Sequence, residues 1–360
     1  MKNPVKVFLV EDSPVASTIL QRILTSSSEI EIVGTANNGI DALKQIPLQK
    51  PDVVCTDLLM EKMDGLELTK QLMARFPRPI LVISDVVTNN NTHKIGQLLE
   101  AGVVDVFPKP KTGFIQDYEK QTNSLIQKII ILAGVKVFTK KKYIDSQQIN
   151  SDNINRQALS NTNIKERKQP KKINYKIIAI GVSTGGPKAL ETIFSQLPAD
   201  FPLAIVCTQH ISVGFLSSLI SWLSQKSNLT IKIAEYGEKP LPGIIYFAPE
   251  NYHLAIDNQG NFSYLNSFDT DIHCPSVNTM FQSFAQFYNQ SMIGILLTGM
   301  GKDGAIGMQE IYKFGGLTIA QDESSSIIFG MPYEAIKLGV VTHTLPLTKI
   351  SSFLIDTINS

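Results

Sequence analysis

The sequence contains few cysteines, a single tryptophan and no long hydrophobic segment. Three cysteines occur, Cys55, Cys207 and Cys274, and they are too few and too widely spaced for a disulfide framework or a zinc knuckle. The most apolar tract, residues 129–135, is far shorter than the roughly 20 residues that cross a bilayer. The N-terminal segment lacks the cleavage pattern of a signal peptide. We therefore expect a soluble, cytoplasmic protein with reduced thiols and no direct membrane insertion.

A charge excess of one sign is also absent. The 33 basic and 32 acidic residues leave a net charge of +1, which argues against a chain that covers nucleic acid or an anionic membrane along its whole surface. With 43% hydrophobic residues, the 360-residue chain can fill the cores of about two domains. The same composition excludes a fully disordered or collagen-like chain.

Short apolar runs alternate with helical patterns in the first part of the chain. Ser13 and Pro14 are typical of a helix N-terminus, with Ser13 as the cap. Strands separated by helices indicate a doubly wound parallel sheet, so we predict a five-stranded, flavodoxin-like α/β domain over residues 1–122. Its strands are expected at five apolar runs: residues 6–10, 30–33, 53–56, 80–84 and 103–107.

The composition changes after this segment. Residues 136–176 are rich in Lys, Arg, Asn, Ser and Gln, from which a packed core is not built. We predict that residues 123–175 comprise the end of a helix followed by a flexible basic linker. Contact of this linker with RNA or lipid is the alternative, and a solvated tether is the favoured interpretation.

Buried-strand patterns return in the second part of the chain, beginning with residues 176–182 (KIIAIGV). Residues 253–256 and 262–265 are separated by five residues that begin with Asp-Asn-Gln-Gly, which is typical of a hairpin turn. We therefore predict a second α/β domain over residues 176–360, doubly wound and mostly parallel, with an antiparallel hairpin. The other strand candidates are residues 203–208, 230–234, 244–248, 293–298 and 317–320.

Polar side chains stand at the ends of four strands predicted for the first domain. Glu11 and Asp12 come after the first strand, Asp57 after the third, Ser84 at the fourth and Lys109 after the fifth. Ligands bind at the carboxyl ends of such strands, and converging carboxylates without His or Cys suit Mg²⁺. A helix cap explains a single Asp at a strand end, but not five polar residues on four strands. The predicted chemistry is an acyl phosphate on Asp57, with the metal and Lys109 neutralising charge.

Residues 1–120 resemble a response-regulator receiver domain through the motifs EDS, DLLMEKMDG and KP. The resemblance implies that Asp57 is phosphorylated and that Ser84 and Lys109 bind the phosphoryl group. It also implies a Mg²⁺ site in the receiver formed by four groups: Glu11, Asp12, Asp57 and the backbone carbonyl of Leu59.

Two positions depart from the receiver pattern. Glu61 stands where proline is usual, which is expected to alter a loop more than the chemistry. Val106 replaces the switch aromatic that usually lies three residues before the lysine, which removes the side chain that an aromatic-rotamer relay needs. Phosphorylation itself is still expected.

A glycine-rich turn follows the first strand of the second domain. Residues 181–185, Gly-Val-Ser-Thr-Gly, match the G-x-S-x-G pattern of a nucleophile elbow around Ser183. A pyrophosphate-binding turn is the alternative, but the full G-x-G-x-x-G spacing is absent. His210 ends the next strand, and Asp303 follows a later strand in the loop Gly-Met-Gly-Lys-Asp-Gly. Parallel strand ends assemble the sites of α/β proteins, so we predict a triad of these three residues.

The order Ser, His, Asp along the chain argues against an α/β-hydrolase, in which Asp precedes His. In the predicted mechanism, His210 takes the proton of Ser183, Asp303 orients the imidazole, and backbone amides bind the oxyanion. His210 then protonates the leaving alkoxide, and water hydrolyses the acyl-enzyme. His273 lies in an irregular segment and is a candidate substrate-side residue. No cofactor is expected in this domain.

The second half of the chain resembles the catalytic domain of the chemotaxis protein-glutamate methylesterases, the CheB family. The shared motifs cover nearly all of residues 176–342: GVSTGGP, QHI, YFAPENYHL, CPSVNTMF, LTGMGKDGAIGM and AQDESSSIIFGMP. The resemblance implies the same triad, with an oxyanion contact from the Met300 amide. It further implies hydrolysis of glutamyl methyl esters on chemoreceptors to glutamate and methanol, and glutamine deamidation by the same acyl transfer.

The resemblance also implies regulation and partners. In this family an unphosphorylated receiver packs across the catalytic face, and phosphorylation by the chemotaxis histidine kinase relieves the block. Asn278 replaces an aspartate common after PSV, and Tyr333 replaces an arginine common after GMP. These departures bear on receptor choice and remove no triad group, whereas the long linker is expected to weaken docking.

Two alternative functions are less well supported. A receiver joined to a catalytically idle, receptor-binding adaptor is disfavoured because the triad residues and the glycines around them are retained. A DNA-binding response regulator is disfavoured because the second domain is too large and strand-rich for a helix-turn-helix module. The partners that the resemblance implies are the histidine kinase and methyl-accepting chemoreceptors, and no nucleic acid is expected.

Overall fold

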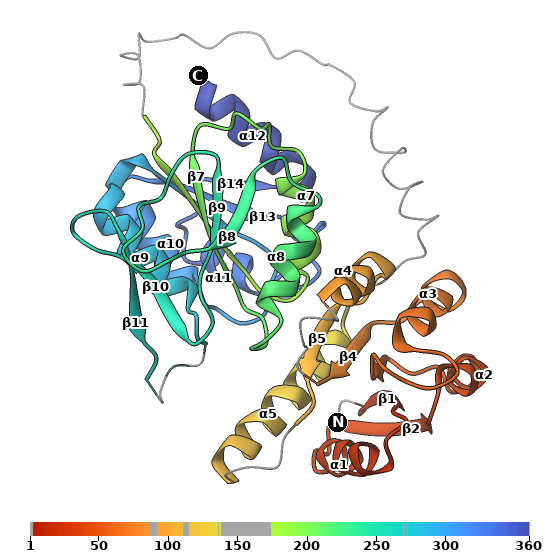
Figure 1. Cartoon of the computed structure of the whole chain (residues 1–360). Helices are drawn as coiled ribbons and strands as arrows, with labels where there is room; N and C mark the ends of the chain where they lie inside the picture. Colours follow the sequence, from red (N-terminus) through yellow and green to blue (C-terminus); the bar gives the residue numbers. More distant parts are fainter. Residues whose placement is uncertain are drawn as a thin grey trace, which may run out of the picture.

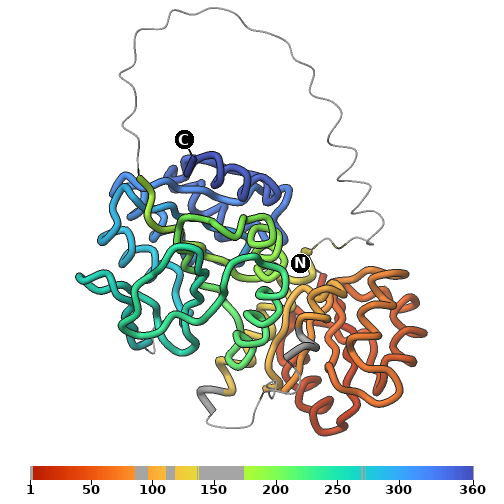
Figure 2. The backbone as a smooth tube through the Cα atoms, turned by 45° about the horizontal axis from the view of Figure 1, so that its top comes forward, coloured from red at the N-terminus to blue at the C-terminus, as the bar shows by residue number. Residues whose placement is uncertain are grey.

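The computed structural model describes residues 3–85, 92–110, 115–135, 137, 174–268, 271 and 273–359. Within these residues the chain forms two α/β domains that lie side by side (Figures 1 and 2). No helix of the described ranges is both long and apolar enough to cross a membrane. Most of the predicted linker, residues 138–173, lies outside the described residues.

The first domain is a five-stranded parallel sheet with helices on both faces, as predicted. The strand order is β2-β1-β3-β4-β5, and all neighbours are parallel. The strands are β1 (Val5–Val10), β2 (Ile30–Ala36), β3 (Val53–Thr56), β4 (Ile80–Ser84) and β5 (Asp105–Pro108). The helices are α1 (Pro14–Thr25), α2 (Gly39–Gln49), α3 (Gly65–Arg75), α4 (Thr92–Ala101) and α5 (Ile115–Leu132).

Local sequence explains the start of α1. The Ser13 hydroxyl accepts a 3.3 Å hydrogen bond from the Ala16 amide, and Pro14 occupies the first turn, which confirms the predicted cap. The central strands β3 and β4 are buried along their whole length, because α1 and α5 cover one face of the sheet and α2, α3 and α4 cover the other.

Helix α5 runs through residue 122, the predicted end of the first domain. Its Leu125, Ile126, Ile129 and Leu132 side chains are buried in the same cluster as residues of β1, β3 and β4. The C-terminal part of α5 therefore packs on the core of the first domain. The domain limits themselves stay a prediction.

The second domain contains a seven-stranded parallel sheet and a separate antiparallel hairpin. The order in the sheet is β14-β13-β12-β6-β7-β9-β8. Its strands are β6 (Ile177–Val182), β7 (Ala204–Gln209), β8 (Thr230–Ile233), β9 (Ile244–Phe247), β12 (Met292–Leu296), β13 (Leu317–Gln321) and β14 (His343–Leu345). The hairpin strands are β10 (Tyr252–Ile256) and β11 (Phe262–Asn266). The helices are α7 (Gly186–Phe194), α8 (Leu216–Ser224), α9 (Val277–Tyr288), α10 (Ala305–Lys313), α11 (Met331–Lys337), α12 (Leu347–Asn359) and the 3₁₀ turn η2 (Asn289–Ser291).

This architecture confirms the predicted fold class. Strand β9, which corresponds to the strand candidate at residues 244–248, lies inside the main sheet between β7 and β8. Three of its four residues are buried, as expected for a strand that is paired on both edges.

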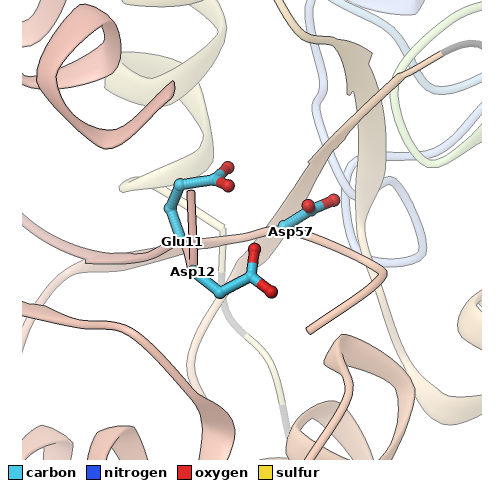
Figure 3. Close-up of side chains that lie close together, drawn as sticks. All are labelled: Glu11, Asp12 and Asp57. Carbon is cyan, nitrogen blue, oxygen red and sulfur yellow. The ribbon is translucent and has the colours of Figure 1, made fainter. Parts of the chain in front are cut away.

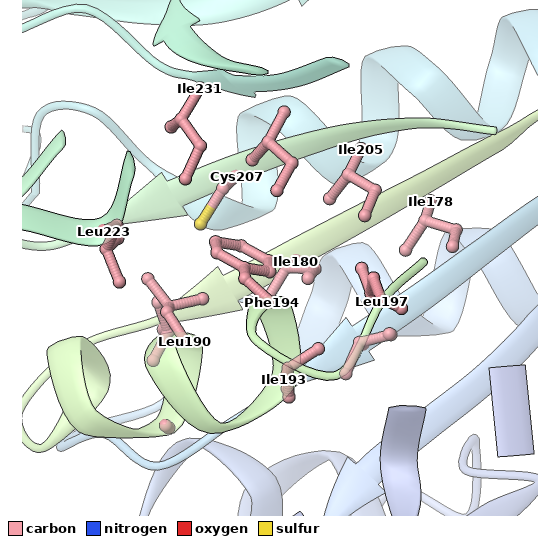
Figure 4. Packing of buried hydrophobic residues seen from close by; sticks show 14 of the residues in the cluster. Ile178, Ile180, Leu190, Ile193, Phe194, Leu197, Ile205, Cys207, Leu223 and Ile231 are labelled. Carbon is pink, nitrogen blue, oxygen red and sulfur yellow. The ribbon is translucent and has the colours of Figure 1, made fainter. Parts of the chain in front are cut away.

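Apolar side chains on both faces of β6 explain its central place in the second domain. Ile178 and Ile180 belong to the cluster under α7, α8 and α12, part of which Figure 4 shows. Ile177 and Ala179 belong to the opposite cluster, with α9, α10 and α11. A parallel strand covered on both sides reads as a near-continuous apolar run, which is what the sequence KIIAIGV contains.

Two of the three cysteines lie within apolar strands and are buried. Cys55 lies in β3 and Cys207 in β7, and both are free thiols. Burial raises the pKa of Cys55 to about 12 and raises that of Cys207 well above 9.0. Both side chains therefore act as packing residues rather than as reactive thiolates.

Candidate active site and phosphorylation site

Three carboxylates meet at the carboxyl ends of β1 and β3. Ligand oxygens of Glu11, Asp12 and Asp57 all lie within 4.8 Å of one another, and Figure 3 shows the three side chains around one space. Strands β1 and β3 are neighbours in the sheet, which is why residues from distant parts of the sequence converge. Hard oxygen donors of this kind suit a divalent cation such as Mg²⁺.

Lys109 joins this cluster from the end of β5. Its Nζ lies 2.6 Å from Asp57 Oδ2 and 2.9 Å from the Glu11 carboxylate. Burial raises the pKa of Glu11 above its usual 4.5, although the hydrogen bond from Lys109 opposes this shift. Burial also disfavours the charge of Lys109, but its hydrogen bonds to Asp57 and Glu11 raise its pKa above 10.5. Glu11 and Asp57 concentrate negative charge in a buried place, and Asp12 adds a carboxylate that is not buried, so the donor set fits a divalent metal.

The other predicted receiver residues lie around the same position. Ser84 is buried at the end of β4, and its carbonyl oxygen accepts a 3.0 Å hydrogen bond from the Lys109 amide. Leu59 lies in the loop after Asp57, and its carbonyl contact to a metal stays a prediction. Gly65 is a residue that the prediction of site residues missed. A Cβ there would lie 2.1 Å from the Asp57 carbonyl oxygen, so only glycine lets α3 begin so close to this loop.

Ser183, His210 and Asp303 lie at the carboxyl ends of β6, β7 and β12. These strands are adjacent in the sheet, in the order β12-β6-β7, and therefore bring together three loops that are far apart in the sequence. Backbone hydrogen bonds fix the loops to one another: the Ser183 amide donates to the Thr298 carbonyl (3.0 Å), and the His210 amide donates to the Val182 carbonyl (2.9 Å).

His210 and Asp303 form a direct contact. Nε2 of His210 lies 2.8 Å from Asp303 Oδ2. Further hydrogen bonds reach the Asp303 carboxylate from the Ser276 hydroxyl and from the amides of Val277, Asn278 and Gly304. Burial opposes the charge of Asp303, but the hydrogen bond from His210 and the amides at the start of α9 outweigh it and hold its pKa well below the usual 3.8. Asp303 is therefore a carboxylate at neutral pH.

The contact with Asp303 determines how the His210 ring can be used. Because a carboxylate only accepts hydrogen bonds, Nε2 carries a proton, and in the neutral ring Nδ1 is then the acceptor. Nδ1 is buried and has no hydrogen-bond partner among the described residues, so the Ser183 hydroxyl does not bond to it in this structure. The ring offers an unpaired basic nitrogen at the sheet edge that carries Ser183, and removal of a serine proton requires such a group.

Met300, the predicted oxyanion residue, lies in the loop between β12 and Asp303. The preceding residue, Gly299, approaches Ser183 so closely that a Cβ on it would lie 2.7 Å from the Ser183 Cβ. The loop that contains Met300 therefore packs directly against the serine. The role of its amide in binding an oxyanion stays a prediction.

Gln209 is a site residue that the sequence analysis did not single out. Its buried side-chain amide nitrogen donates to the carbonyl oxygens of Ser183 (2.9 Å) and His210 (2.8 Å). One side chain thus joins the loop after β6 to the loop after β7. Its only sequence signal is its place beside His210 in the motif QHI.

Two positions of the second domain that depart from the expected pattern lie in the helices α9 and α11. The side-chain oxygen of Asn278 accepts a 2.8 Å hydrogen bond from the Gly307 amide and so joins α9 to α10. Tyr333, in α11, is 47% exposed, and its ring centroid lies 6.0 Å from that of Phe329. Their influence on receptor choice stays a prediction.

The first domain packs against the second domain, as Figures 1 and 2 show. The contact lies on the side of the second domain that includes α8 and the loop after β6. Thr184, the neighbour of Ser183, donates a 3.1 Å hydrogen bond to Asp105 of β5. Glu100 of α4 pairs with Lys226 (2.7 Å) and accepts a hydrogen bond from Trp222 Nε1 in α8 (3.3 Å). The contact between the domains therefore includes the loop that carries the serine.

A small cavity between the domains lies against His210. Its lining includes Asp105 and Val106 of the first domain and Gln209 and His210 of the second. Val106 is also buried in a cluster that contains Phe215 of the second domain. The small side chain three residues before Lys109 thus lies at the contact between the domains.

Comparisons with known proteins agree with this architecture. Residues 178–354 match the CheB methylesterase family, and residues 7–114 match the response regulator receiver domain. A protein-glutamate methylesterase/protein-glutamine glutaminase of Hahella chejuensis is 35% identical over 355 residues, covering 97% of this chain and 97% of the relative. One from Carboxydothermus hydrogenoformans is 39% identical over 351 residues, covering 96% of this chain and 97% of the relative.

A solved structure is also similar to the second half of the chain. The catalytic domain of Thermotoga maritima CheB methylesterase is 39% identical, covers 51% of this chain and 98% of its own length, and has a TM-score of 0.49. The full-length relatives match both domains in the same order as in this chain. The chain therefore belongs to the CheB family of protein-glutamate methylesterases/protein-glutamine glutaminases, with a receiver domain in front of the methylesterase domain.

Proposed function

We propose that this chain hydrolyses methyl esters of glutamate side chains on methyl-accepting chemoreceptors to glutamate and methanol, for adaptation in bacterial chemotaxis. Glutamines of the same receptors are deamidated by the same acyl transfer. The observation that carries the proposal is the 2.8 Å contact between His210 and Asp303, which leaves Nδ1 unpaired at the sheet edge that carries Ser183. The names of relatives at 35% and 39% identity support this substrate class. The receptor helices that carry these esters are cytoplasmic, so we place the reaction in the cytoplasm.

In the proposed reaction, His210 Nδ1 takes the proton of the Ser183 hydroxyl while Oγ attacks the ester carbonyl carbon. Asp303, which is charged and bound by the first turn of α9, keeps Nε2 protonated and stabilises the imidazolium. The Met300 amide donates a hydrogen bond to the oxyanion of the tetrahedral intermediate. His210 returns the proton to the methoxide leaving group. Water then attacks the acyl-enzyme, with His210 again as the base.

Phosphorylation of Asp57 is proposed to control this reaction, with the chemotaxis histidine kinase as the phosphodonor. Ser84 and Lys109 bind the phosphoryl group in this proposal. When bound, a Mg²⁺ ion supplies positive charge beside the phosphoryl oxygens. Its proposed ligands are Glu11, Asp12, Asp57 and the backbone carbonyl of Leu59.

The contact between the domains supports this control. Strand β5 begins at Asp105, which accepts a hydrogen bond from Thr184 beside Ser183, and Lys109 follows its last residue. Lys109 in turn pairs with Asp57. A rearrangement of Lys109 on phosphorylation therefore acts on the strand that contacts the serine loop. In the proposal, the unphosphorylated receiver keeps the receptor away from this loop, and phosphorylation releases the receiver.

Methanol release from a methylated chemoreceptor fragment tests the proposal, with the full chain, with and without Mg²⁺ and acetyl phosphate. We expect release to rise with the phosphodonor, Asp57→Ala to keep only the basal rate, and Ser183→Ala to release none. Methanol release that does not respond to the phosphodonor would support the esterase activity but reject its control by the receiver. Equal release by Ser183→Ala would reject the mechanism, and no release by any folded variant would favour a receptor-binding adaptor.

A further inference from the structure

The His210 ring has a second neighbour, which the proposed mechanism does not use. His273 lies in the segment between β11 and α9, and its ring stacks on the His210 ring with centroids 4.2 Å apart and planes 16° apart. At this distance the two flat rings are in face-to-face contact. One face of the imidazole that serves as the proposed base is therefore covered.

The contact of His273 with the face of the His210 ring restricts rotation of that ring. The contacts of His210 with Asp303 and Gln209 do not prevent this rotation. Asp303 holds the ring at a single atom, Nε2, and the Gln209 amide bonds only to the backbone of His210. The terminal side-chain torsion of histidine has a broad energy well, so the ring can swing about the Asp303 contact. Such a swing displaces Nδ1, the nitrogen that must face Ser183. A flat ring stacked on the imidazole limits this displacement.

The segment that carries His273 is held on both sides. The buried His253 contacts Asp271 through Nε2 (2.9 Å), and its Nδ1 accepts a 3.0 Å hydrogen bond from the Ser276 amide. The Ser276 hydroxyl in turn donates to Asp303 (3.1 Å). One short segment therefore sets the position of both the His273 ring and the Asp303 carboxylate.

His273 is uncharged at neutral pH. Burial and then the proximity of His210 lower the pKa of His273 from 6.5 to about 4. A neutral ring can remain stacked while His210 gains a positive charge during proton transfer, whereas a second positive charge at this distance would oppose it.

We propose that His273 is a positioning residue for ester hydrolysis, whose ring fixes the plane of the His210 imidazole so that Nδ1 faces Ser183. This inference rests on the proposed function and adds a residue to the same site. A positioning role acts on kcat, whereas contact with the substrate alone acts on KM.

Two variants of His273 distinguish the effect of a flat ring from the effects of the other properties of the histidine side chain. His273→Ala removes the stacked ring, and His273→Phe keeps a flat ring in its place. On the methylated receptor fragment with acetyl phosphate, we expect His273→Ala to lower kcat about 10-fold to 100-fold with KM changed by less than about twofold. We expect His273→Phe to recover most of the lost kcat. His343→Ala is the matched control, because His343 also contacts an aromatic ring, Phe353 (4.7 Å), but lies on the edge strand β14.

A fluorophosphonate that labels activated serines gives a second measurement, which does not depend on the receptor. The labelling rate of Ser183 should fall together with kcat in His273→Ala and recover in His273→Phe. Thermal unfolding of each variant establishes that it is folded. If His273→Ala does not fold, His273→Leu takes its place, because leucine fills the volume without a flat ring.

Unchanged kcat and labelling rate in His273→Ala would overturn the inference, as would a loss confined to KM. A loss of kcat that phenylalanine does not restore would also overturn it, since the flat ring would then not be the cause. If the wild-type chain is labelled but releases no methanol, the proposed function fails. The labelling rates of the variants then still decide the role of His273.

Discussion

Asp303 serves both the fold and the proposed reaction. Its carboxylate accepts hydrogen bonds from the amides of Val277 and Asn278 and so joins the loop after β12 to the N-terminus of α9. The same carboxylate contacts His210. The charge that stabilises the start of a helix is therefore also the charge that orients the imidazole.

At this residue, we expect Asp303→Asn to lower kcat about 10,000-fold and to lower the free energy of unfolding by about 2–3 kcal/mol at pH 7. Asparagine removes the charge, and its NH₂ group would face donors with which it cannot bond. Because the pKa of Asp303 in the folded chain lies below its usual 3.8, the stability advantage of the wild type is complete above that value. The advantage declines as the pH falls toward the folded pKa.

Urea unfolding of both chains at pH 7 and pH 3 measures this dependence. The exposed Asp200 provides the control, because Asp200→Asn makes the same change of charge without buried partners in α9. A stability difference between wild type and Asp303→Asn that is equal at the two pH values would contradict the role given to the charge.

Strand order sets the limit of what the sequence can predict about the site. Ser183, His210 and Asp303 each follow an apolar run, and parallel strands present their carboxyl ends on one edge, so these residues could be predicted to converge. The lengths of the apolar runs do not determine the order of the strands in the sheet. Only the structure shows that β7 and β12 lie on either side of β6. The fold class was therefore predictable, and the adjacency of the three loops was not. The catalytic roles of the three residues stay a prediction.

Side-chain contacts between loops were also beyond the sequence. Gln209 ends an apolar strand, and the sequence around it gives no sign that its side-chain amide joins two loops. The stacking of His273 depends on a segment without helical or strand periodicity, so no pattern places its ring. Both contacts depend on the relative positions of separate elements, which local propensities do not determine.

At the junction between the loop after β3 and helix α3, we expect Gly65→Ala to slow phosphorylation of Asp57. A Cβ at this position would lie 2.1 Å from the Asp57 carbonyl oxygen, so the loop or the helix must shift. Such overpacking should lower the free energy of unfolding by about 1–3 kcal/mol. Phosphate incorporation from acetyl phosphate and urea unfolding are the measurements. Gly134→Ala is the matched control, because its Cβ would meet no atom closer than 3.4 Å, and equal phosphorylation of the two variants would refute the expectation.

For the molecule as a whole, the elements of the receiver that border its acidic cluster also contact the second domain. Lys109 after β5 pairs with Asp57, and Asp105 at the start of β5 accepts hydrogen bonds from Thr184 and from Lys128 of α5 (2.7 Å). Helix α4 adds a second contact, with α8. The proposed phosphorylation site and the serine loop are thus joined through one short strand, while α4 supplies contacts that neither site needs for its chemistry.

Substitutions in these α4 contacts should weaken the closed arrangement, in which the receiver packs against the second domain. They change neither the phosphorylation site nor the serine loop. Glu100 pairs with Lys226 at 2.7 Å and accepts a hydrogen bond from Trp222, and the paired side chains are partly exposed, so the pair is worth at most about 1 kcal/mol. We therefore expect Glu100→Ala to raise methanol release by the unphosphorylated chain up to about fivefold. The phosphorylated rate should not change, because the proposed release of the receiver already breaks this contact.

Glu29→Ala is the matched control, since it removes an exposed glutamate next to β2, at the opposite edge of the receiver sheet from β5. Urea unfolding should show that neither variant destabilises the receiver. If Glu100→Ala leaves the unphosphorylated rate unchanged, the contact between α4 and α8 does not keep the domains closed. Control by the receiver would then have to act through Asp105 and Thr184, and Asp105→Ala should raise the unphosphorylated rate where Glu100→Ala does not.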